Sequence, residues 1–254
     1  MDFFLKLDFW FTVLRCTTPV LFATLAALIA SQSGLLNLGL EGAMAIAALC
    51  GVLGSGFTGS LFVGAVSGLA AGTLFTMLLA YFIQHLKANQ VITGVAMNLA
   101  ASGGSVFALY SLTGDKNASN SLASSAFPTW NIPVIKDIPG VGQVVSGHNC
   151  LTYLAFILAI VFYIVLKKTS FGIHVRAVGE SEEAASSVGI KVKKVRYEAM
   201  LISGILASLG GMYLSMGYVN RFTAGMVAGR GYIALATNAM AAGSSLLGMF
   251  SSVL

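Results

Sequence analysis

The stretch LFVGAVSGLAAGTLFTMLLAYFI, residues 61–83, decides the fold class because it holds no charged residue and no run of polar residues. A helix needs about 20 such residues to cross the hydrocarbon core of a bilayer. The strands of a membrane barrel would instead alternate apolar and polar residues over roughly 10 positions. Helices and closed barrels are the two folds that satisfy the backbone within lipid, so the stretch predicts a membrane-spanning helix.

The composition of the whole chain agrees with this interpretation. Of the 254 residues, 57% are hydrophobic and 9% are charged, whereas soluble domains carry about 25% charged residues. The 29 glycines suit close helix packing in lipid. We therefore predict an all-α polytopic integral membrane helical bundle with broken or short helices. The three cysteines show no metal-ligand spacing, and we expect no metal and no cofactor.

Further apolar segments set the expected organisation of the chain. The segment at 43–56 is short for a full crossing, and residues 114–149 hold three of the four prolines and predict a loop outside the membrane. The last segment is uncharged, so we expect a single domain over residues 1–254 that is truncated and lacks its last helices. The apolar segments lie near residues 11–30, 43–56, 61–83, 91–112, 151–166, 200–219 and 231–254.

Basic residues predict the orientation. Lysine and arginine concentrate in loops on the cytoplasmic side of membrane proteins, which places residues 167–196 in the cytoplasm. Counting back along the chain, the loop at 114–149 lies outside, residues 31–42 approach from the cytoplasmic side, and the N-terminus is outside. The basic side chains that carry this prediction are Lys167, Lys168, Arg176, Lys191, Lys193, Lys194 and Arg196.

Within the cytoplasmic loop, residues 179–190 predict a short exposed helix. Glu180, Glu182 and Glu183 fall in its expected first turn, where carboxylates complement the positive end of the helix dipole. Gly189 stands where a glycine commonly ends a helix. Such a helix would let a soluble motor protein push on a membrane subunit. The alternative is a solvated loop between two membrane spans.

Glu41 is the sharpest local feature of the apolar part of the chain. It lies in SGLLNLGLEGAM, residues 33–44, and is the only carboxylate between Asp8 and Asp115. A carboxylate near the membrane interior is costly and is usually functional. The surrounding glycines predict a helix that breaks and restarts, and a restarted helix directs its backbone N–H groups into a cavity. The alternative is that Glu41 caps the next helix at the cytoplasmic interface.

Asn98 lies in the middle of an apolar span and needs a hydrogen-bond partner, either another helix or a ligand. The glycine pairs at 103–104 and 210–211 predict close approach between helices. We find no Ser-His-Asp set and no paired carboxylates, and basic residues form no face with interleaved aromatics for nucleic acid. A phosphate-binding Gly-x-x-x-x-Gly-Lys loop is also absent from the sequence, so the chain is not expected to be an enzyme or to hydrolyse ATP itself.

Three stretches resemble the membrane permease subunits of bacterial ATP-binding-cassette importers, in the branch that handles branched-chain amino acids, ribose-type sugars and nucleosides. Residues 33–49 resemble one signature of this branch, and residues 175–192 resemble its cytoplasmic coupling segment, in which Glu183, Ala184, Ala185 and Gly189 fit the wider E-A-A-x-x-x-G pattern. The isoleucine and leucine-proline that often follow that pattern are absent. AGRGYIALA, residues 228–236, and NLAASG, residues 98–103, are closest to the nucleoside permeases.

The resemblance implies a multi-pass permease of the bacterial inner membrane that imports nucleosides. Its implied partners are cytoplasmic ATPase subunits, a second permease subunit and a substrate-binding lipoprotein. The ATPase would contact Glu180, Glu182, Glu183, Ala184, Ala185 and Gly189. The substrate pathway would include Asn37, Glu41, Asn98, Tyr232 and Asn238, because amides offer the donors and acceptors that nucleobase edges require.

Other functions remain open from the sequence. A sugar or branched-chain amino acid permease of the same branch would share these signatures. An ion-coupled secondary transporter would need a titratable group deep in the bundle, and Glu41 is the candidate. A channel or membrane scaffold would need no exposed coupling helix.

Overall fold

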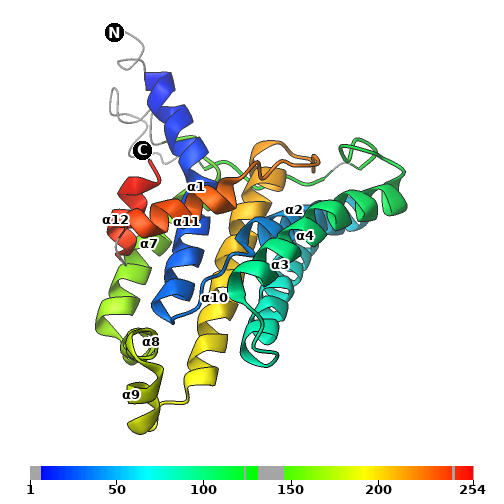
Figure 1. Cartoon of the computed structure of the whole chain (residues 1–254). Coiled ribbons are helices and arrows are strands. Elements are labelled where there is room, and N and C mark those ends of the chain that lie inside the picture. The colour runs from blue at the N-terminus through cyan, green and yellow to red at the C-terminus, as the bar shows by residue number, and fades with distance from the viewer. Residues whose placement is uncertain (1–6, 123, 131–145, 242–243, 254) are drawn as a thin grey trace.

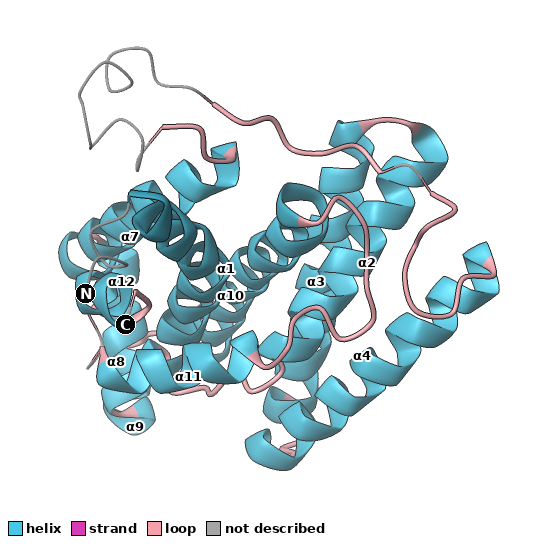
Figure 2. Ribbon diagram, turned by 90° about the horizontal axis from the view of Figure 1, so that it is seen from above, coloured by secondary structure: helices cyan, strands magenta, loops and turns pink. Residues whose placement is uncertain are grey.

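The computed structural model describes residues 7–122, 124–130, 146–241 and 244–253. Over these residues the chain forms a helical bundle in which most long helices run side by side (Figures 1 and 2). The only extended pairings among the described residues are two isolated bridges, Ala118 with Thr223 and Thr129 with Asn149. The predicted all-α class is confirmed.

Within the described part of the chain, six helices are long and apolar enough to cross a membrane. They match six of the seven predicted apolar segments, and this confirms a polytopic, multi-pass membrane protein. The segment at 43–56 extends at both ends and reaches the length of a full crossing. The six are α1 Leu7–Gln32, α2 Leu40–Thr58, α3 Leu61–Gln84, α4 Gln90–Thr113, α7 Cys150–Lys168 and α10 Val192–Met212, which continues as the π-helix η1 Tyr213–Tyr218.

The seventh apolar segment folds differently from the other six. It forms two short helices, α11 Arg230–Met240 and α12 Ser245–Ser251. At about 1.5 Å per residue, neither reaches across a hydrocarbon core of about 30 Å. Figure 1 shows α11 lying across the direction of α1 and α10. Hydropathy alone did not reveal this break because both halves are apolar.

Two helices form the centre of the bundle. In α1 and α10, 78% of the apolar window is buried inside the protein, compared with 22% in α3, 28% in α4 and 33% in α7. Leu21, Leu25 and Ala207 belong to the core between them. The outer helices therefore leave their apolar faces for the bilayer, which acts as their solvent.

Glycines on α3 allow it to pack closely on α2 and α10. Gly64, Gly68 and Gly72 recur every fourth residue and so lie on one face of the helix. A Cβ atom on Gly64 would lie 2.6 Å from the Cβ of Ser55, and one on Gly68 would lie 2.9 Å from the backbone oxygen of Ala47. Small residues at this spacing are typical of helix contacts in lipid.

The two predicted glycine pairs have different outcomes. Gly211 packs so tightly on the backbone of Met44 that no side chain fits there, which confirms close approach at this pair. The prediction is wrong for Gly103 and Gly104 within this chain, since nothing lies within 4 Å of a Cβ atom built on either residue. Their face of α4 is exposed.

The loop predicted to be cytoplasmic, residues 167–196, contains two helices in place of the single predicted one. They are α8 Ser170–Glu180 and α9 Glu182–Ser187. Ser181 has an extended backbone and its Oγ accepts a hydrogen bond from the Ala184 N–H at 3.3 Å, as in a helix N-cap. Placing Glu180 in the first turn was therefore wrong, because Glu180 ends α8. Gly189, with φ of +85°, follows α9 as predicted.

Candidate functional site

The chain between α1 and α2 leaves the helical conformation, as the glycines predicted. Residues 33–39, which we call the break, lead from the end of α1 at Gln32 to the start of α2 at Leu40. Gly34 has φ of +77°, a conformation that glycine adopts readily. The Leu36 N–H donates to Oε1 of Gln90 at 2.8 Å, which ties the break to the beginning of α4.

Glu41 lies in the first turn of α2 and binds the start of a different helix. Its two carboxylate oxygens accept hydrogen bonds from the N–H groups of Gly229 and Gly231, each at 2.8 Å. These donors belong to the N-terminal end of α11, where N–H groups lack partners in their own helix and a negative charge is favourable. Capping by Glu41 was one of the two sequence interpretations, but the capped helix is α11.

Glycine at position 231 makes this contact possible. A Cβ atom on Gly231 would lie 2.6 Å from the backbone nitrogen of Glu41 and 2.8 Å from its Cα. Any side chain here would push the start of α11 away from α2. The AGRGYIALA stretch therefore supplies both the donors and the space for the carboxylate.

Asn98 joins three elements at the same place. Its Oδ1 accepts a hydrogen bond from the Gly42 N–H at 2.8 Å, and its Nδ2 donates to the Leu38 oxygen at 2.8 Å and the Tyr232 hydroxyl at 2.9 Å. Both amide hydrogens are used, so Asn98 links helices in this conformation. Leu38, Glu41, Gly42, Asn98 and residues 229–232 together are called the helix junction below.

Asn37 and Asn238 each keep one unused hydrogen-bond acceptor. Asn37 is 1% exposed and donates to Oγ of Ser203 at 2.9 Å, while Asn238 donates to Oγ of Ser31 at 3.2 Å. The Oδ1 atoms of both side chains are buried without a hydrogen-bond partner. An unsatisfied buried acceptor is costly, so each is suited to receive a donor from water or a ligand.

A small cavity of about 50 Å³ opens beside the helix junction. Small-molecule sites usually measure about 300–1,000 Å³, so the junction is closed in this conformation and has room for water only. The side chain of Tyr232 lies outside the cavity lining and is 46% exposed. The polar and aromatic residues that line the cavity are Glu41, Asn98, Ser102, Ser105 and Phe222.

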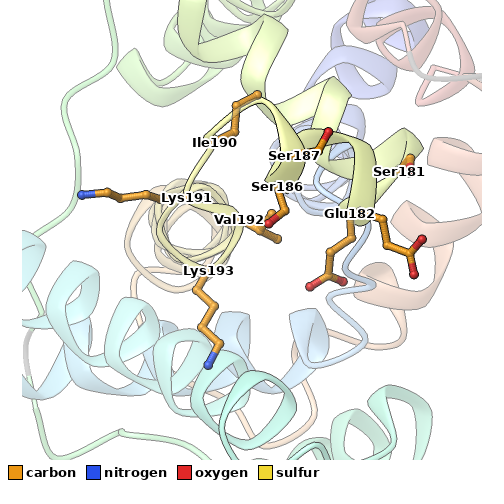
Figure 3. A pocket seen from close by; sticks show the side chains of 9 residues that line it. Ser181, Glu182, Ser186, Ser187, Ile190, Lys191, Val192 and Lys193 are labelled. Atoms are coloured by element: carbon orange, nitrogen blue, oxygen red, sulfur yellow. The ribbon is translucent and has the colours of Figure 1, made fainter.

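The second candidate region is residues 170–196, which include α8, α9 and the start of α10. We call it the coupling segment because it contains residues 175–192, which resemble the coupling segment of importer permeases. A hollow of about 1,060 Å³ lies beside α9. Figure 3 shows Lys191 and Glu182 on its lining, with the Lys191 side chain pointing away from Glu182. Ala185 is 3% exposed and packs with Val175, Val178 and Val195. Ala185 therefore anchors α9 to the bundle, while Glu182, Glu183, Ala184 and Gly189 are exposed.

Comparison with known proteins identifies the family. A family model described as "Branched-chain amino acid transport system / permease component" matches residues 9–254. This chain belongs to that permease family. The permease is 31% identical to "Nucleoside ABC transporter permease protein NupC" of Lactococcus lactis, over 94% of this chain and 76% of NupC.

Two further relatives differ in the substrate that their names state. The permease is 34% identical to "Guanosine ABC transporter permease protein NupQ" of Bacillus subtilis, over 83% of this chain and 68% of NupQ. It is 27% identical to "Glucose ABC transporter permease protein TsgB13" of Haloferax volcanii, over 85% of this chain and 59% of that relative. The proteins similar to this chain are therefore named for nucleosides, for guanosine and for glucose.

Sequence reasoning missed several residues of the permease that the structure places at these two regions. Gly229 and Gly231 hold Glu41, and Ser203 binds Asn37. Arg196, which served only as an orientation marker, forms an ion pair with Glu182 at 2.9 Å. Gly229 and Gly231 fall inside the AGRGYIALA stretch, residues 228–236, but the sequence did not link that stretch to Glu41, because the contacts join residues far apart in the chain.

Proposed function

We propose that the chain is the membrane permease subunit of an ATP-binding-cassette importer that moves nucleosides into the cytoplasm. The observation that carries the proposal is its similarity, at 31% and 34% identity over most of the chain, to permeases named for nucleosides and guanosine. Six apolar helices and an exposed short helix between two of them agree with this role. A separate subunit hydrolyses ATP.

The coupling segment is the proposed docking site for the cytoplasmic ATPase subunits. Three features support this: α9 is exposed, a hollow lies beside it, and its first turn carries Glu182 and Glu183. A second permease subunit and a substrate-binding lipoprotein complete the importer in the bacterial inner membrane. The lipoprotein faces the 114–149 loop, of which residues 131–145 lie outside the described part.

The proposed substrate pathway passes the helix junction and includes Asn37, Glu41, Asn98, Tyr232 and Asn238. The bundle alternates between outward-open and inward-open states, and the small cavity beside the junction enlarges when α11 moves relative to α2. The unused acceptors of Asn37 and Asn238 suit the N–H and O–H donors of a nucleoside. Asn98 acts mainly by keeping the junction together.

The test of function is uptake into proteoliposomes that contain the permease, its ATPase subunits and its binding protein. Labelled guanosine should accumulate only when ATP is present on the side of the membrane that carries the ATPase subunits. Unlabelled nucleosides should compete with guanosine for uptake. Accumulation should survive a proton ionophore at constant ATP. Loss of uptake with the ionophore would instead support an ion-coupled secondary transporter and overturn the importer assignment.

A sugar importer is the second candidate, because the family includes a relative named as a glucose permease. The same vesicles distinguish the two functions when labelled glucose and leucine replace guanosine. Glucose uptake without guanosine uptake would keep the importer architecture and reject the nucleoside. Leucine uptake would point to the branched-chain amino acid members.

Kinetics test the pathway residues separately from the importer role. Asn37→Ala and Asn238→Ala should raise KM for the substrate because they remove acceptors that bind it. Asn98→Ala should mainly lower kcat because it loosens the helix junction, which must close and open in each cycle. If all three variants transport with wild-type KM and kcat, the pathway does not pass these residues.

A further inference from the structure

Arg196 lies between the coupling segment and the break, and contacts both. Its guanidinium forms the ion pair with Glu182, the first residue of α9, at 2.9 Å. Its Nε donates a hydrogen bond to the backbone oxygen of Ser33 at 3.3 Å. One side chain on α10 therefore connects the exposed helix α9 with the chain that joins α1 to α2.

A second contact joins the same two regions through the backbone alone. Gly179, near the end of α8, packs against Gln32 and Gly34, and a Cβ atom on Gly179 would collide with the Gln32 carbonyl. A Cβ atom on Gly34 would lie 3.4 Å from the Cα of Gly179 and 3.5 Å from the guanidinium of Arg196. This backbone contact fixes α8 against the break, whereas a side-chain ion pair holds α9.

The ion pair is accessible enough to break and form again. The side chain of Arg196 is 18% exposed and that of Glu182 is 57% exposed. Both residues line a hollow of about 430 Å³ that also borders Leu35 in the break. The carboxylate of Glu182 stays in contact with water, and an ion pair with such an exposed partner contributes little stability. A small displacement of α9 therefore changes the contact without unfolding the segment.

Beyond Arg196, the contacts continue from the break to the helix junction. Asn37 binds Ser203, and the oxygen of Leu38 accepts a hydrogen bond from Asn98. Asn98 in turn binds Tyr232 of α11. The break is thus held by the coupling segment at its beginning and by the helix junction at its end.

We propose that Arg196 is a positioning residue that transmits the movement of α9 to the break and, through it, to the helix junction. The proposal rests on the importer function and adds a route to it. When an ATPase moves α9, Glu182 pulls or releases Arg196, and the hydrogen bond to Ser33 shifts the break. Chains of packed side chains and hydrogen bonds that have two discrete arrangements can carry such coupling between distant sites.

The test measures nucleoside uptake per ATP hydrolysed in the reconstituted importer, with ATPase subunits at saturating concentration. Arg196→Gln and Glu182→Gln should each lower this ratio by about fivefold or more, the usual lower range of a coupling effect, while ATP hydrolysis continues. Glu182 is exposed, so its variant remains informative if the Arg196 variant folds poorly. A residue with only a structural role would lower both activities together.

The matched control is the ion pair between Lys194 and Glu198 on the same helix. This pair is longer, at 3.7 Å, and the two side chains are 72% and 44% exposed. Glu198→Gln breaks this pair at a residue of α10 outside the coupling segment, and it removes one negative charge, as Glu182→Gln does, without touching α9 or the break. Its uptake-to-hydrolysis ratio should equal that of the wild type.

A charge exchange tests whether the pair itself carries the effect. The double variant Arg196→Glu with Glu182→Arg restores an ion pair but removes the donor to Ser33, so its ratio should stay as low as those of the single variants. A double variant that recovers the wild-type ratio would overturn the route through Ser33. So would wild-type ratios in both single glutamine variants.

Failure of this proposal is distinguishable from failure of the proposed function. If the wild-type vesicles show no ATP-dependent nucleoside uptake, the function is wrong and Arg196 has nothing to transmit. If the wild type transports and the Arg196 and Glu182 variants remain fully coupled, the importer stands and the route through Arg196 is rejected.

Discussion

Glu41 and Glu182 both lie in the first turn of a helix, yet they bind different partners. Glu41 accepts hydrogen bonds from two backbone N–H groups at the start of α11. Glu182 meets one guanidinium and its side chain is 57% exposed. Both residues look alike in a sequence-based capping analysis. Their partners, rather than their positions in their own helices, determine what each one holds.

The difference has a physical basis in what the partners can do when the carboxylate is lost. Backbone N–H groups at the start of α11 cannot reorient towards another hydrogen-bond acceptor unless the helix unwinds. The apolar bundle around them offers few other acceptors. A guanidinium in an open hollow can bind water instead. We therefore expect Glu41 to be a structural requirement and Glu182 to be a contact that can change during a cycle.

The largest effect should follow from Glu41→Ala. Two partly buried donors, the N–H groups of Gly229 and Gly231, would lose their acceptor, and each such loss costs about 1–3 kcal/mol. Removing a carboxylate from an apolar site regains part of this, so we expect a net loss of about 3 kcal/mol in the free energy of unfolding. Reversible denaturation of the purified permease in mixed micelles measures it.

Glu183→Ala is the matched control for this change. Glu183 lies beside Glu182 in the first turn of α9 and is exposed, so its loss should alter the free energy of unfolding by about 0.5 kcal/mol or less. Equal destabilisation by the two variants would contradict the contrast between the helix junction and the coupling segment.

A smaller effect is expected at the tight contact between α10 and α2. Gly211→Ala places a methyl group against the backbone of Met44 and should cost about 2 kcal/mol, a typical penalty for overpacking. Gly103→Ala introduces the same group where nothing lies within 4 Å and should be neutral or slightly stabilising, because alanine favours helix. The same micelle denaturation compares the two, and a neutral Gly211 variant would mean that the helices separate easily.

The sequence predicted what depends on composition and local spacing. Continuous apolar runs gave six membrane helices, and the glycines around Glu41 gave the break between α1 and α2. The partners of Glu41 could not be predicted, because Gly229 and Gly231 lie 188 and 190 residues away. Hydrophobicity also could not divide the last apolar segment into α11 and α12. Both a short helix that lies across the long helices and a long helix that spans the membrane can consist of apolar residues.

The ion pair of Glu182 should matter little to stability even though we propose that it matters to coupling. Glu182→Gln should change the free energy of unfolding by about 0.5 kcal/mol, as is usual for exposed ion pairs. The same denaturation experiment on this variant checks the value. If Glu182→Gln lowered the free energy of unfolding as much as Glu41→Ala, α9 would be held as rigidly as α11. An ion pair between Arg196 and Glu182 that breaks and forms during the cycle would then be excluded.

The smallest effect is expected at Asp115, a carboxylate held only by its own turn. Hydrogen bonds from the backbone N–H and the hydroxyl of Ser121, at 3.0 and 2.7 Å, lower the pKa of Asp115 below its ordinary value. Because the folded state binds this proton less readily than the unfolded chain, the turn is stabilised above the ordinary pKa of about 4 and loses this contribution as the pH falls below it. Ser121→Ala should raise the pKa of Asp115 towards its ordinary value, which NMR titration of a labelled permease in micelles would detect. The free energy of unfolding of this variant at neutral pH should hardly change, because the carboxylate lies in water and can bind water in place of Ser121. A large change would mean that Asp115 is a structural requirement like Glu41 and not an exposed carboxylate like Glu182.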